Sequence, residues 1–356
     1  DHRDLHSFPT RRSSDLKRAF KYIGYERTHS GHQSRLHIHQ NRGLRRPQGN
    51  FWQNHPAHCR RPGTVAHICQ QFEFRKKAIF AELENNRIDS AHFAAVIGRG
   101  GVVRPIPSGT YRVNELMLKH LTDGSSGEHA SNLGALLAHS IAETIPGCKA
   151  FISDPVVVDE LQDVARITGI PEIQRLSILH ALNQKAIAKR HAGIMGKSYD
   201  QLNLIVVHLG GGISVGAHRK GRIIDVNNAL NGDGPIAPER AGTIPALQLV
   251  KLCFSGKYTY EQIRKMLTGK GGMIAHMGTN SFMELNHMVQ SGDPKATAIY
   301  NAMAYTIAKQ IGATAAVLCG QIDGILFTGG ISHNKHFIWA IRSRASRVPS
   351  PFFSIW

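Results

Sequence analysis

The chain has 356 residues, of which 42% are hydrophobic, and this length is sufficient for two domains with sizeable cores. No apolar run approaches the length of a membrane span, so the composition predicts a soluble protein without a membrane partner. The five cysteines form no CxxC pair, which argues against a disulfide framework and favours the reducing cytoplasm, and no segment has the pattern of a secretory signal.

The formal net charge of +18 is typical of proteins that bind nucleic acid. Its distribution argues against that class. Residues 1–69 carry 13 Lys/Arg, 4 Asp/Glu and nine of the 21 histidines, a net charge of +9, whereas the other half of the charge is spread over about four times that length. We therefore expect an anomalous basic N-terminal segment (residues 1–69, the head) followed by a chain of ordinary charge (from residue 70, the body), with no nucleic-acid partner. A basic nucleic-acid-binding protein stays the alternative of a different class.

The head lacks the pattern of a folded domain. Residues 6–16 (HSFPTRRSSDL) resemble translated sequencing-adapter DNA, and residues 32–62 show neither strand nor helix periodicity. Back-translated and read one base forward, residues 30–44 permit LVINPGSTSTKIAVY, a strand, a glycine turn with a lysine, and a second strand. The same shift over residues 55–63 permits IRHTADDLA. We hypothesise a frame slip that closes near residue 65, and we expect residues 1–69 to be disordered; a genuine disordered basic tail is the alternative.

The body, from residue 70, reads as a mixture of helices and strands. In chain order we predict a helix at 72–86, a strand with a glycine turn at 92–101, a strand and helix at 109–121, a helix at 127–147, a strand at 149–157, a helix at 177–196, strands at 202–209 and within 213–226 with a turn at 219–221, helices at 246–256, 259–267 and 296–318, and a strand with a glycine turn at 322–332. This succession predicts an α/β fold.

HLGGGIS at 208–214 follows one apolar strand and precedes another. Because neither Gly-Lys-Ser/Thr nor a helix follows, the motif is neither a P-loop nor a Rossmann fingerprint. A strand–GGG–strand hairpin can turn its N–H groups toward an anion, and a tight hairpin without a ligand is the alternative. TGGIS at 328–332 is a second strand–glycine turn, which either accommodates a ring or phosphate against the main chain or is a plain loop.

Five charged or titratable side chains stand at the ends of these elements. Arg99 lies between glycines at a strand end, and Arg240 lies in PERAG; such arginines can fork onto a carboxylate or phosphate. His129 is near a helix start, His180 is on an apolar helix face, and Asp154 is at a strand end. Each alone also fits an ordinary role, as a surface arginine, a core or capping histidine, or a turn aspartate.

Together, the motifs resemble one family. GRGG, GTYRVNE, GEHASNLG, ISDPVVVDE, HALNQKA, VVHLGGGISVGAHRKGRIIDVNNALNGDGP, PERAG, LVKLCFSGKYTYEQIRKMLTGKGG and LFTGGIS are similar to the butyrate and branched-chain carboxylic acid kinases of the acetokinase family. The resemblance covers about residues 70–337, and the shifted frame resembles the family's first phosphate motif, NPGSTSTK. It implies a two-domain acetate/sugar-kinase and actin-like (ribonuclease H-like) fold, with an incomplete N-terminal domain at 70–150, a nucleotide-binding domain at 151–337 and a divergent tail at 338–356.

The resemblance also implies a reaction: butanoate and ATP, with Mg²⁺, give butanoyl phosphate and ADP reversibly, in a cytoplasmic enzyme that forms homo-oligomers when complete. Positioning and charge neutralisation dominate such phosphoryl transfer. By resemblance Arg99 binds the carboxylate and Arg240 stabilises the transferring phosphoryl group. His129 and His180 hydrogen-bond its oxygens, and Asp154 orients these groups. The implied nucleotide-binding residues are His208, Gly210, Gly211, Gly212 and Ser214 at the phosphates and Gly329, Gly330 and Ile331 at the adenosine.

Two departures from the family pattern bear on activity. The first phosphate motif is absent from the frame as translated, and so is the family's C-terminal Pro-Gly-Glu-Asp segment, whose carboxylate approaches magnesium. We therefore expect the chain as translated to fold poorly and to be inactive. An acetate or propionate kinase of the same family and a catalytically dead homologue with a binding role stay open as alternatives, because the sequence does not place the residues that set substrate length.

Overall fold

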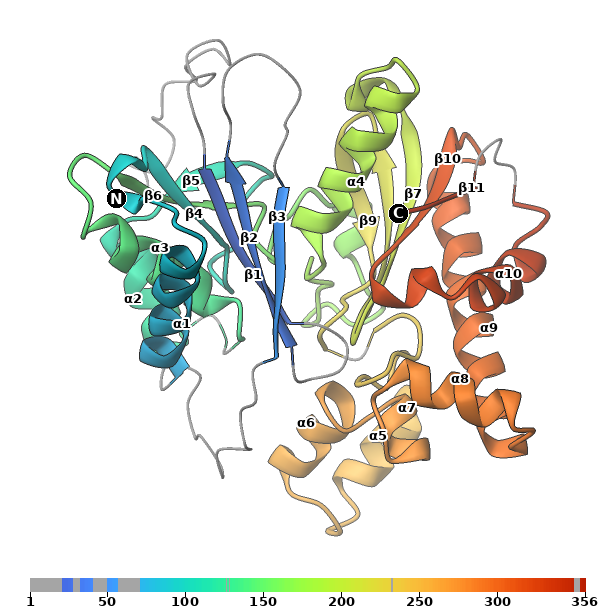
Figure 1. Ribbon diagram of the computed structural model, residues 1–356. Coiled ribbons are helices and arrows are strands. Elements are labelled where there is room, and N and C mark those ends of the chain that lie inside the picture. The colour runs from blue at the N-terminus through green and yellow to red at the C-terminus, as the bar shows by residue number, and fades with distance from the viewer. Residues whose placement is uncertain are drawn as a thin grey trace.

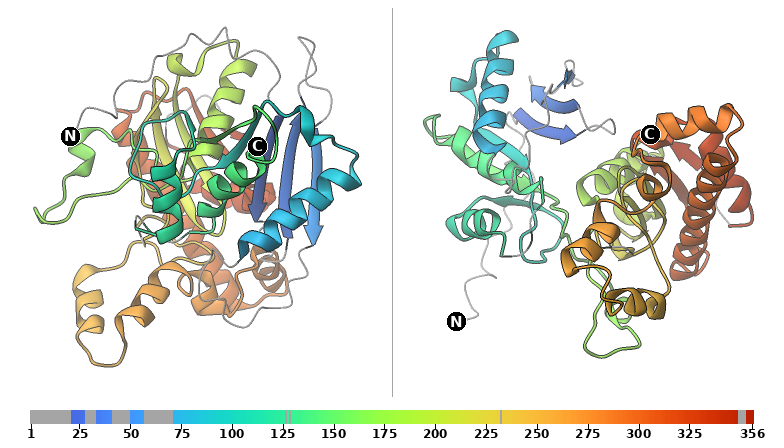
Figure 2. Two further views of the ribbon diagram at one scale, coloured as in Figure 1. Left: turned by 90° about the vertical axis from the view of Figure 1, so that its left-hand side faces the viewer. Right: turned by 90° about the horizontal axis from the view of Figure 1, so that it is seen from below.

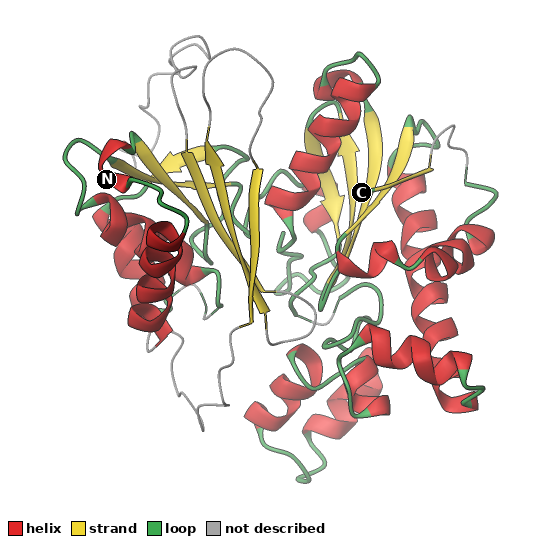
Figure 3. Ribbon diagram, viewed as in Figure 1, coloured by secondary structure: helices red, strands yellow, loops and turns green. Residues whose placement is uncertain are grey.

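The computed structural model describes residues 21–27, 33–40, 50–56, 71–125, 127, 129–231, 233–348 and 353–356. These residues form two α/β halves that lie side by side, each built on β-sheet with helices packed against it (Figures 1 and 3). The α/β class predicted from the sequence is confirmed. In the described ranges no helix is long and apolar enough to cross a membrane.

The N-terminal half contains two three-stranded sheets. β1 (Lys21–Arg27), β2 (Gln33–Gln40) and β3 (Asn50–Pro56) pair antiparallel in that order. β4 (Ala95–Arg99) pairs parallel with β6 (Lys149–Ser153), whose other edge takes the short antiparallel β5 (Thr110–Arg112). β1 lies alongside β4, so the two sheets adjoin (Figure 1). Helices α1 (Phe72–Asn85), α2 (Glu115–Asp123) and α3 (Asn132–Ala142) pack together, with α3 against β4 and β6.

The strands β1 to β3 differ from the disorder that we expected for residues 1–69. Strand pairing uses main-chain N–H and C=O groups, which every residue except proline supplies, so a polar composition does not prevent it. Within β2, Leu36 and Ile38 alternate with Arg35, His37 and His39, a short period of two that fits a strand. The adapter-like residues 6–16 and the closing point of the hypothesised frame slip lie outside the described residues, and the slip stays a hypothesis.

The C-terminal half is built on one five-stranded sheet of order β11-β10-β7-β8-β9. Its strands are β7 (Asn203–Leu209), β8 (Ile213–Arg219), β9 (Arg222–Val226), β10 (Gly324–Thr328) and β11 (Phe353–Ile355). The helices are α4 (Ala181–Ile194), α5 (Ala246–Cys253), α6 (Tyr260–Thr268), α7 (Met273–Met277), α8 (Phe282–Gln290), α9 (Pro294–Val317) and α10 (Lys335–Arg344). α4 covers one face of the sheet and α9 the other (Figure 1).

β7 is buried along its whole length, because both faces of the sheet are covered. Ile205 and Val207 belong to the core shared with α9, whereas Leu204 and Val206 belong to the core shared with α4. This alternation explains why LNLIVVHL reads as a continuous apolar run. The turn predicted at 219–221 is confirmed, since Arg219 pairs with Arg222 across a two-residue turn in which Lys220 and Gly221 have positive φ.

The described residues of the divergent tail expected at 338–356 continue the same half. α10 runs across residue 337 without interruption, and Phe337, Ile338 and Ile341 are buried in the core under α9. β11 then pairs parallel with β10 at the sheet edge, where the Trp356 N–H donates to the Phe327 carbonyl over 2.9 Å. After α4, this half therefore runs in chain order from the three strands β7–β9 through the helices α5–α9 to β10, α10 and β11. The view from below shows the two halves next to each other (Figure 2).

Two glycines let helix α3 approach the end of β4. A Cβ at Gly98 would lie 2.0 Å from the Gly134 carbonyl oxygen, and a Cβ at Gly134 would lie 2.1 Å from the Arg99 carbonyl oxygen. Neither distance is compatible with a real Cβ, and both obstacles are main-chain atoms that cannot rotate away. The contact therefore fixes the main chain of Arg99 against the helix.

We expect Gly134→Ala to destabilise the protein by about 1–3 kcal/mol, because the methyl group overpacks this contact. Gly312, in the middle of α9, has no atom within 4 Å of the point where a Cβ would lie, so Gly312→Ala serves as the matched control. This control should be stabilising by up to ~1 kcal/mol from helix propensity alone. Urea denaturation of both variants measures the difference, and equal midpoints would contradict the close packing.

Candidate active site

A pocket lies where β4 and β6 of the N-terminal half end and α4 of the C-terminal half begins. It is lined by Arg99, Gly100, Asp154, Val156, His180, Ala181, Leu182 and Asn183. The strand ends and the helix start therefore bring together three of the five side chains proposed from the sequence as catalytic, Arg99, Asp154 and His180. His129 and Arg240 are near enough to act electrostatically on one another and on His180.

Arg240 is a positive charge held mostly out of water. Burial lowers the pKa of its guanidinium, with Glu239 opposing the shift, and its Nε is buried with no hydrogen-bond partner among the described residues. A Cβ at Gly212 would lie 1.7 Å from Arg240 Nη1, so the guanidinium occupies the space that this glycine leaves empty. Within the described ranges neither Arg240 nor Arg99 forms an ion pair with a carboxylate. A buried, unpaired cation favours an anionic ligand.

The histidines near these arginines are held neutral. Burial, then the charges of Arg240 and Arg99, lower the pKa of His129 to about 4. Burial, then His208 and Arg240, lower the pKa of His180 well below its usual value. The Ser131 main-chain N–H donates to His129 Nδ1 over 3.2 Å, so the neutral ring carries its proton on Nε2. The rings are therefore hydrogen-bond donors rather than additional cations.

His180 stands at the start of α4 rather than on the apolar helix face that the sequence predicted. The helix begins at Ala181, and His180 is its N-cap residue with φ −85° and ψ 59°. Its ring stacks on that of His208, with centroids 3.8 Å apart and planes at 11°, and His208 Nδ1 donates to Asn183 Oδ1 over 2.8 Å. Stacking and the strand end thereby fix both rings at the pocket.

Asp154 holds a turn of the main chain as well as lining the pocket. Its Oδ1 accepts hydrogen bonds from the Ser108 hydroxyl at 2.6 Å and from the Gly109 N–H at 2.9 Å, and its side chain is buried at 7% exposure. The residue has φ +38°, which is rare for a residue other than glycine. Such strain is common where a side chain must be presented at a fixed point.

The two glycine motifs meet at one edge of the C-terminal sheet. β7 and β10 are parallel with His208 opposite Thr328, so HLGGGIS and TGGIS both leave the sheet at the same end. Gly329 has φ +88°, and a Cβ there would lie 2.4 Å from the Leu209 carbonyl oxygen. The three central glycines differ: only Gly212 faces Arg240, whereas a Cβ at Gly211 would reach 3.4 Å from Glu239, an ordinary contact.

Two residues predicted to face the nucleotide are interior instead. Ser214 is 0% exposed, and its hydroxyl is bonded to His180 Nδ1 and Gln184 Nε2, each at 2.8 Å. Ile331 is 2% exposed and packs in the core under α9. Ser214 is interior because both faces of β8 are covered, and Ile331 is interior because the short turn of 3₁₀-helix at Gly330–His333 packs it against the core.

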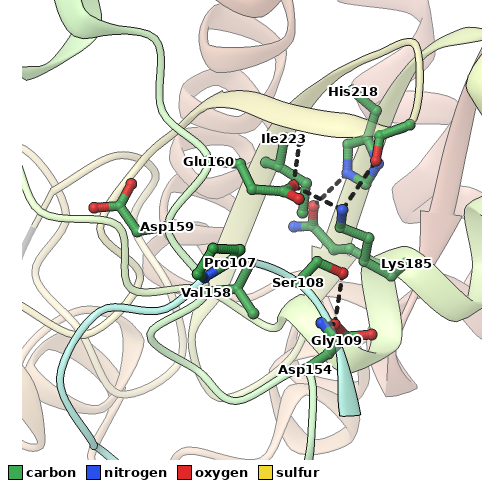
Figure 4. A network of polar contacts seen from close by, with 12 residues as sticks. Pro107, Ser108, Gly109, Asp154, Val158, Asp159, Glu160, Lys185, His218 and Ile223 are labelled. Carbon is green, nitrogen blue, oxygen red and sulfur yellow. Dashed lines mark hydrogen bonds and ion pairs between the residues drawn. The ribbon is translucent and has the colours of Figure 1, made fainter. Parts of the chain in front are cut away.

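A polar network behind the pocket was missed in the sequence (Figure 4). Lys185 is 2% exposed, and its Nζ donates to Glu160 Oε2 over 2.6 Å and to the Gly221 carbonyl over 3.0 Å. His218 Nε2 bonds to Gln184 Oε1 at 2.9 Å. Three consecutive polar residues in HALNQKA, directly after the apolar stretch SIL, are the sequence signal that points to this interior role.

Comparison with known proteins identifies the family. The chain is 55% identical over 268 residues to butyrate kinase 2 of Clostridium acetobutylicum, an alignment that covers 75% of each protein. The chain belongs to the acetokinase family. The sequence profile of that family matches residues 172–346, and therefore continues beyond residue 337, where the resemblance was expected to stop.

Solved structures of acetate and propionate kinases have the same fold as this chain. The acetate kinase of Porphyromonas gingivalis superposes with a TM-score of 0.71 over 93% of this chain and 88% of that one, at 16% identity. A propionate kinase from Francisella tularensis superposes with a TM-score of 0.68 over 92% and 88%, also at 16% identity. The acetate-kinase, actin-like fold that the sequence resemblance implied is therefore confirmed.

We expect the free energy of unfolding of the protein to fall in acid, because a buried histidine resists protonation. Burial, then Lys185, lower the pKa of His218 to about 3, so between pH about 6.5 and about 3 only the unfolded state takes up this proton. The unfolding free energy should therefore fall as the pH falls through this window, by up to ~1.4 kcal/mol per pH unit for this one group. His218→Gln should flatten that slope in urea titrations.

The control for the His218 measurement is His276→Gln, at an exposed histidine of α7. This variant should keep the pH slope of the parent chain. Equal slopes for the parent and His218→Gln would contradict the neutral, buried state of His218.

Proposed function

We propose that this chain phosphorylates butanoate, transferring the γ-phosphoryl group of ATP to the carboxylate to give butanoyl phosphate and ADP, reversibly. The observation that carries the proposal is that Arg99 and His180 line one pocket, with Arg240 and His129 close by. In the described structure neither arginine has a carboxylate partner, and both histidines are neutral. A carboxylate and a phosphoryl group supply the two anions that these arginines require.

Each side chain has a role that its position supports. Arg99 ends β4 at the pocket and is suited to bind the carboxylate, which at neutral pH is already ionised and nucleophilic. Arg240 neutralises charge on the transferring phosphoryl group, and the Nε2–H groups of His129 and His180 donate to its oxygens. Asp154 positions the Ser108–Gly109 turn at the same pocket. No general base is required, because the attacking oxygen carries no proton.

The nucleotide is proposed to lie at the end of the C-terminal sheet where the glycine motifs meet. The main-chain N–H group of Gly211 is suited to its phosphates and the Gly329–Gly330 turn to its adenosine, whereas the Gly210 N–H already donates to the Gly212 carbonyl at 3.1 Å. The described residues contain no cluster of three or more His, Cys, Asp or Glu that would hold a metal alone. Mg²⁺, which neutralises phosphate charge, would be held chiefly by the phosphates, with Asp154 as the carboxylate nearest the pocket.

The pocket lining favours an acid with an alkyl chain. Val156, Ala181 and Leu182 line it beside Arg99, so a carboxylate bound by the arginine would place its tail against apolar side chains. Acetate or propionate kinase activity is the second candidate, because shorter tails satisfy the same arginine. We also propose that the enzyme acts in the cytoplasm, where ATP is available, and assembles as a homo-oligomer, which analytical ultracentrifugation would measure.

We expect acyl phosphate, trapped as hydroxamate, to form with butanoate and isobutanoate faster than with propionate or acetate. The assay compares the chain as encoded with a chain in which residues 30–63 are restored to the alternative reading frame. We expect activity only in the restored chain, because the NPGSTSTK motif returns with it. Activity of the encoded chain would refute the expected inactivity, and a restored chain without any carboxylate-dependent turnover would refute the proposed function.

We expect Gly212→Ala to reduce kcat of the restored chain by at least ~100-fold, because the new methyl group displaces the Arg240 guanidinium. Arg240→Ala should cost as much or more. Gly211→Ala is the matched control, since its methyl group meets only an ordinary contact with Glu239, and its effect should be several-fold smaller. If Gly211→Ala and Gly212→Ala reduce kcat equally, the space that Arg240 occupies does not explain why position 212 requires glycine.

A further inference from the structure

We propose that a buried hydrogen-bond relay, from Tyr199 through His218, Gln184 and Ser214, holds His180 as the neutral tautomer with its proton on Nε2. Gln184, His218 and Ser214 are then positioning residues, since they act on the reaction through His180. The relay is inferred from the structure alone. The identity of the group that accepts the hydrogen bond from His180 Nε2–H rests on the proposed function.

The relay is continuous from Tyr199, behind α4, to the pocket. Tyr199 Oη lies 2.6 Å from His218 Nδ1, and His218 Nε2 lies 2.9 Å from Gln184 Oε1. Gln184 Nε2 lies 2.8 Å from Ser214 Oγ, which in turn lies 2.8 Å from His180 Nδ1. Gln184, Ser214 and His218 are all 0% exposed, so water does not replace any of these inner links. Figure 4 shows the His218 end of this network beside Lys185.

The orientation of the Gln184 amide sets the direction of donation. Gln184 Nε2 also lies 3.2 Å from the Ser214 main-chain oxygen, which can only accept, so the NH₂ group faces Ser214. Its oxygen therefore faces His218, which must carry its proton on Nε2 and accept from the Tyr199 hydroxyl at Nδ1. Burial keeps both groups neutral, because it lowers the pKa of His218 to about 3 and raises the pKa of Tyr199.

The Ser214 hydroxyl in turn donates a hydrogen bond to His180. Its oxygen already accepts from Gln184, so its own proton needs an acceptor, and His180 Nδ1 is the only other group bonded to it among the described residues. The reverse arrangement would leave a fully buried O–H without a partner, at a cost of about 1–3 kcal/mol. His180 Nδ1 therefore accepts, and the proton of the neutral ring lies on Nε2, the nitrogen left for the pocket.

The surrounding main chain is shaped to keep Gln184 in place. A Cβ at Gly216 would lie 2.4 Å from Gln184 Oε1 and 3.1 Å from His218 Nε2, so a side chain at this point of β8 would displace the Gln184 amide. The Lys185–Glu160 ion pair, with N···O 2.6 Å, joins the next residue of α4 to the chain that follows β6. Glu160 Oε2 also accepts from the Ile223 N–H at 2.8 Å, which ties the helix to β9. These contacts hold α4 in register with the sheet.

The test reads the tautomer directly in the full encoded chain labelled with [¹⁵N]histidine. Long-range ¹H–¹⁵N correlations distinguish Nε2–H, Nδ1–H and protonated rings, and His180→Gln assigns the signal. We expect His180 to show the Nε2–H pattern alone. In Gln184→Met, which keeps the length but removes the amide, we expect a mixture of tautomers. Gln310→Met, the same change on α9, is the control and should leave the pattern unchanged.

Two results would overturn the relay: an Nδ1–H or protonated His180 in the parent chain, or an unchanged pattern in Gln184→Met. If Gln184→Met does not fold, the tautomer in the parent chain still decides. Titration of the chain restored at residues 30–63 with butanoyl phosphate separates the proposals. A shift of the His180 Nε2–H resonance supports both of them, whereas no shift with the Nε2–H tautomer present counts against the proposed function and leaves the relay supported.

Discussion

The positive charge of Arg240, held mostly away from water and without a carboxylate partner in the described structure, constrains most of what surrounds it. A guanidinium in this position is costly unless an anion neutralises it, so the site favours an anionic ligand. Gly212 leaves the space that the guanidinium fills. The neighbouring histidines are neutral, which avoids adding further positive charge while leaving N–H donors. An acyl-phosphate-forming site needs this combination, because negative charge is concentrated on the phosphoryl group as it moves between two oxygens.

The rest of the fold brings the ends of distant strands to this charge. Parallel pairing of β7 and β10 places two glycine motifs, more than a hundred residues apart in sequence, at the same sheet edge. The glycine contact between β4 and α3 fixes the main chain of Arg99 from the opposite half. The site is therefore assembled from strand ends of both halves, as is usual for ligands bound at the carboxyl ends of strands in α/β folds.

Behind the site, a series of buried groups all donate hydrogen bonds in the same direction, toward His180. The chain of hydrogen bonds through Gln184 and Ser214 ends on His180 and specifies which of its nitrogens donates. Buried polar networks of this kind are costly unless every member is satisfied, and each inner member here has its partners. Orientation of a neutral donor is consistent with a reaction that depends on positioning rather than on proton transfer.

The sequence by itself determined the α/β class, the order of most elements, the turn at 219–221 and the family, because apolar runs, glycine turns and long motifs are local signals that survive without coordinates. It also singled out Arg99, Asp154 and His180, which line one pocket, although the roles of these residues stay proposals. Strand formation at 21–27, 33–40 and 50–56, and the incorporation of α10 and β11 into the C-terminal half, were missed, since strand pairing depends on partners far away in the chain. Only the tertiary structure decided that Ser214 and Ile331 point inward and that Gly212 makes room for an arginine. These facts depend on which face of a strand is covered and on what approaches from another element, and neither is encoded within the motif itself.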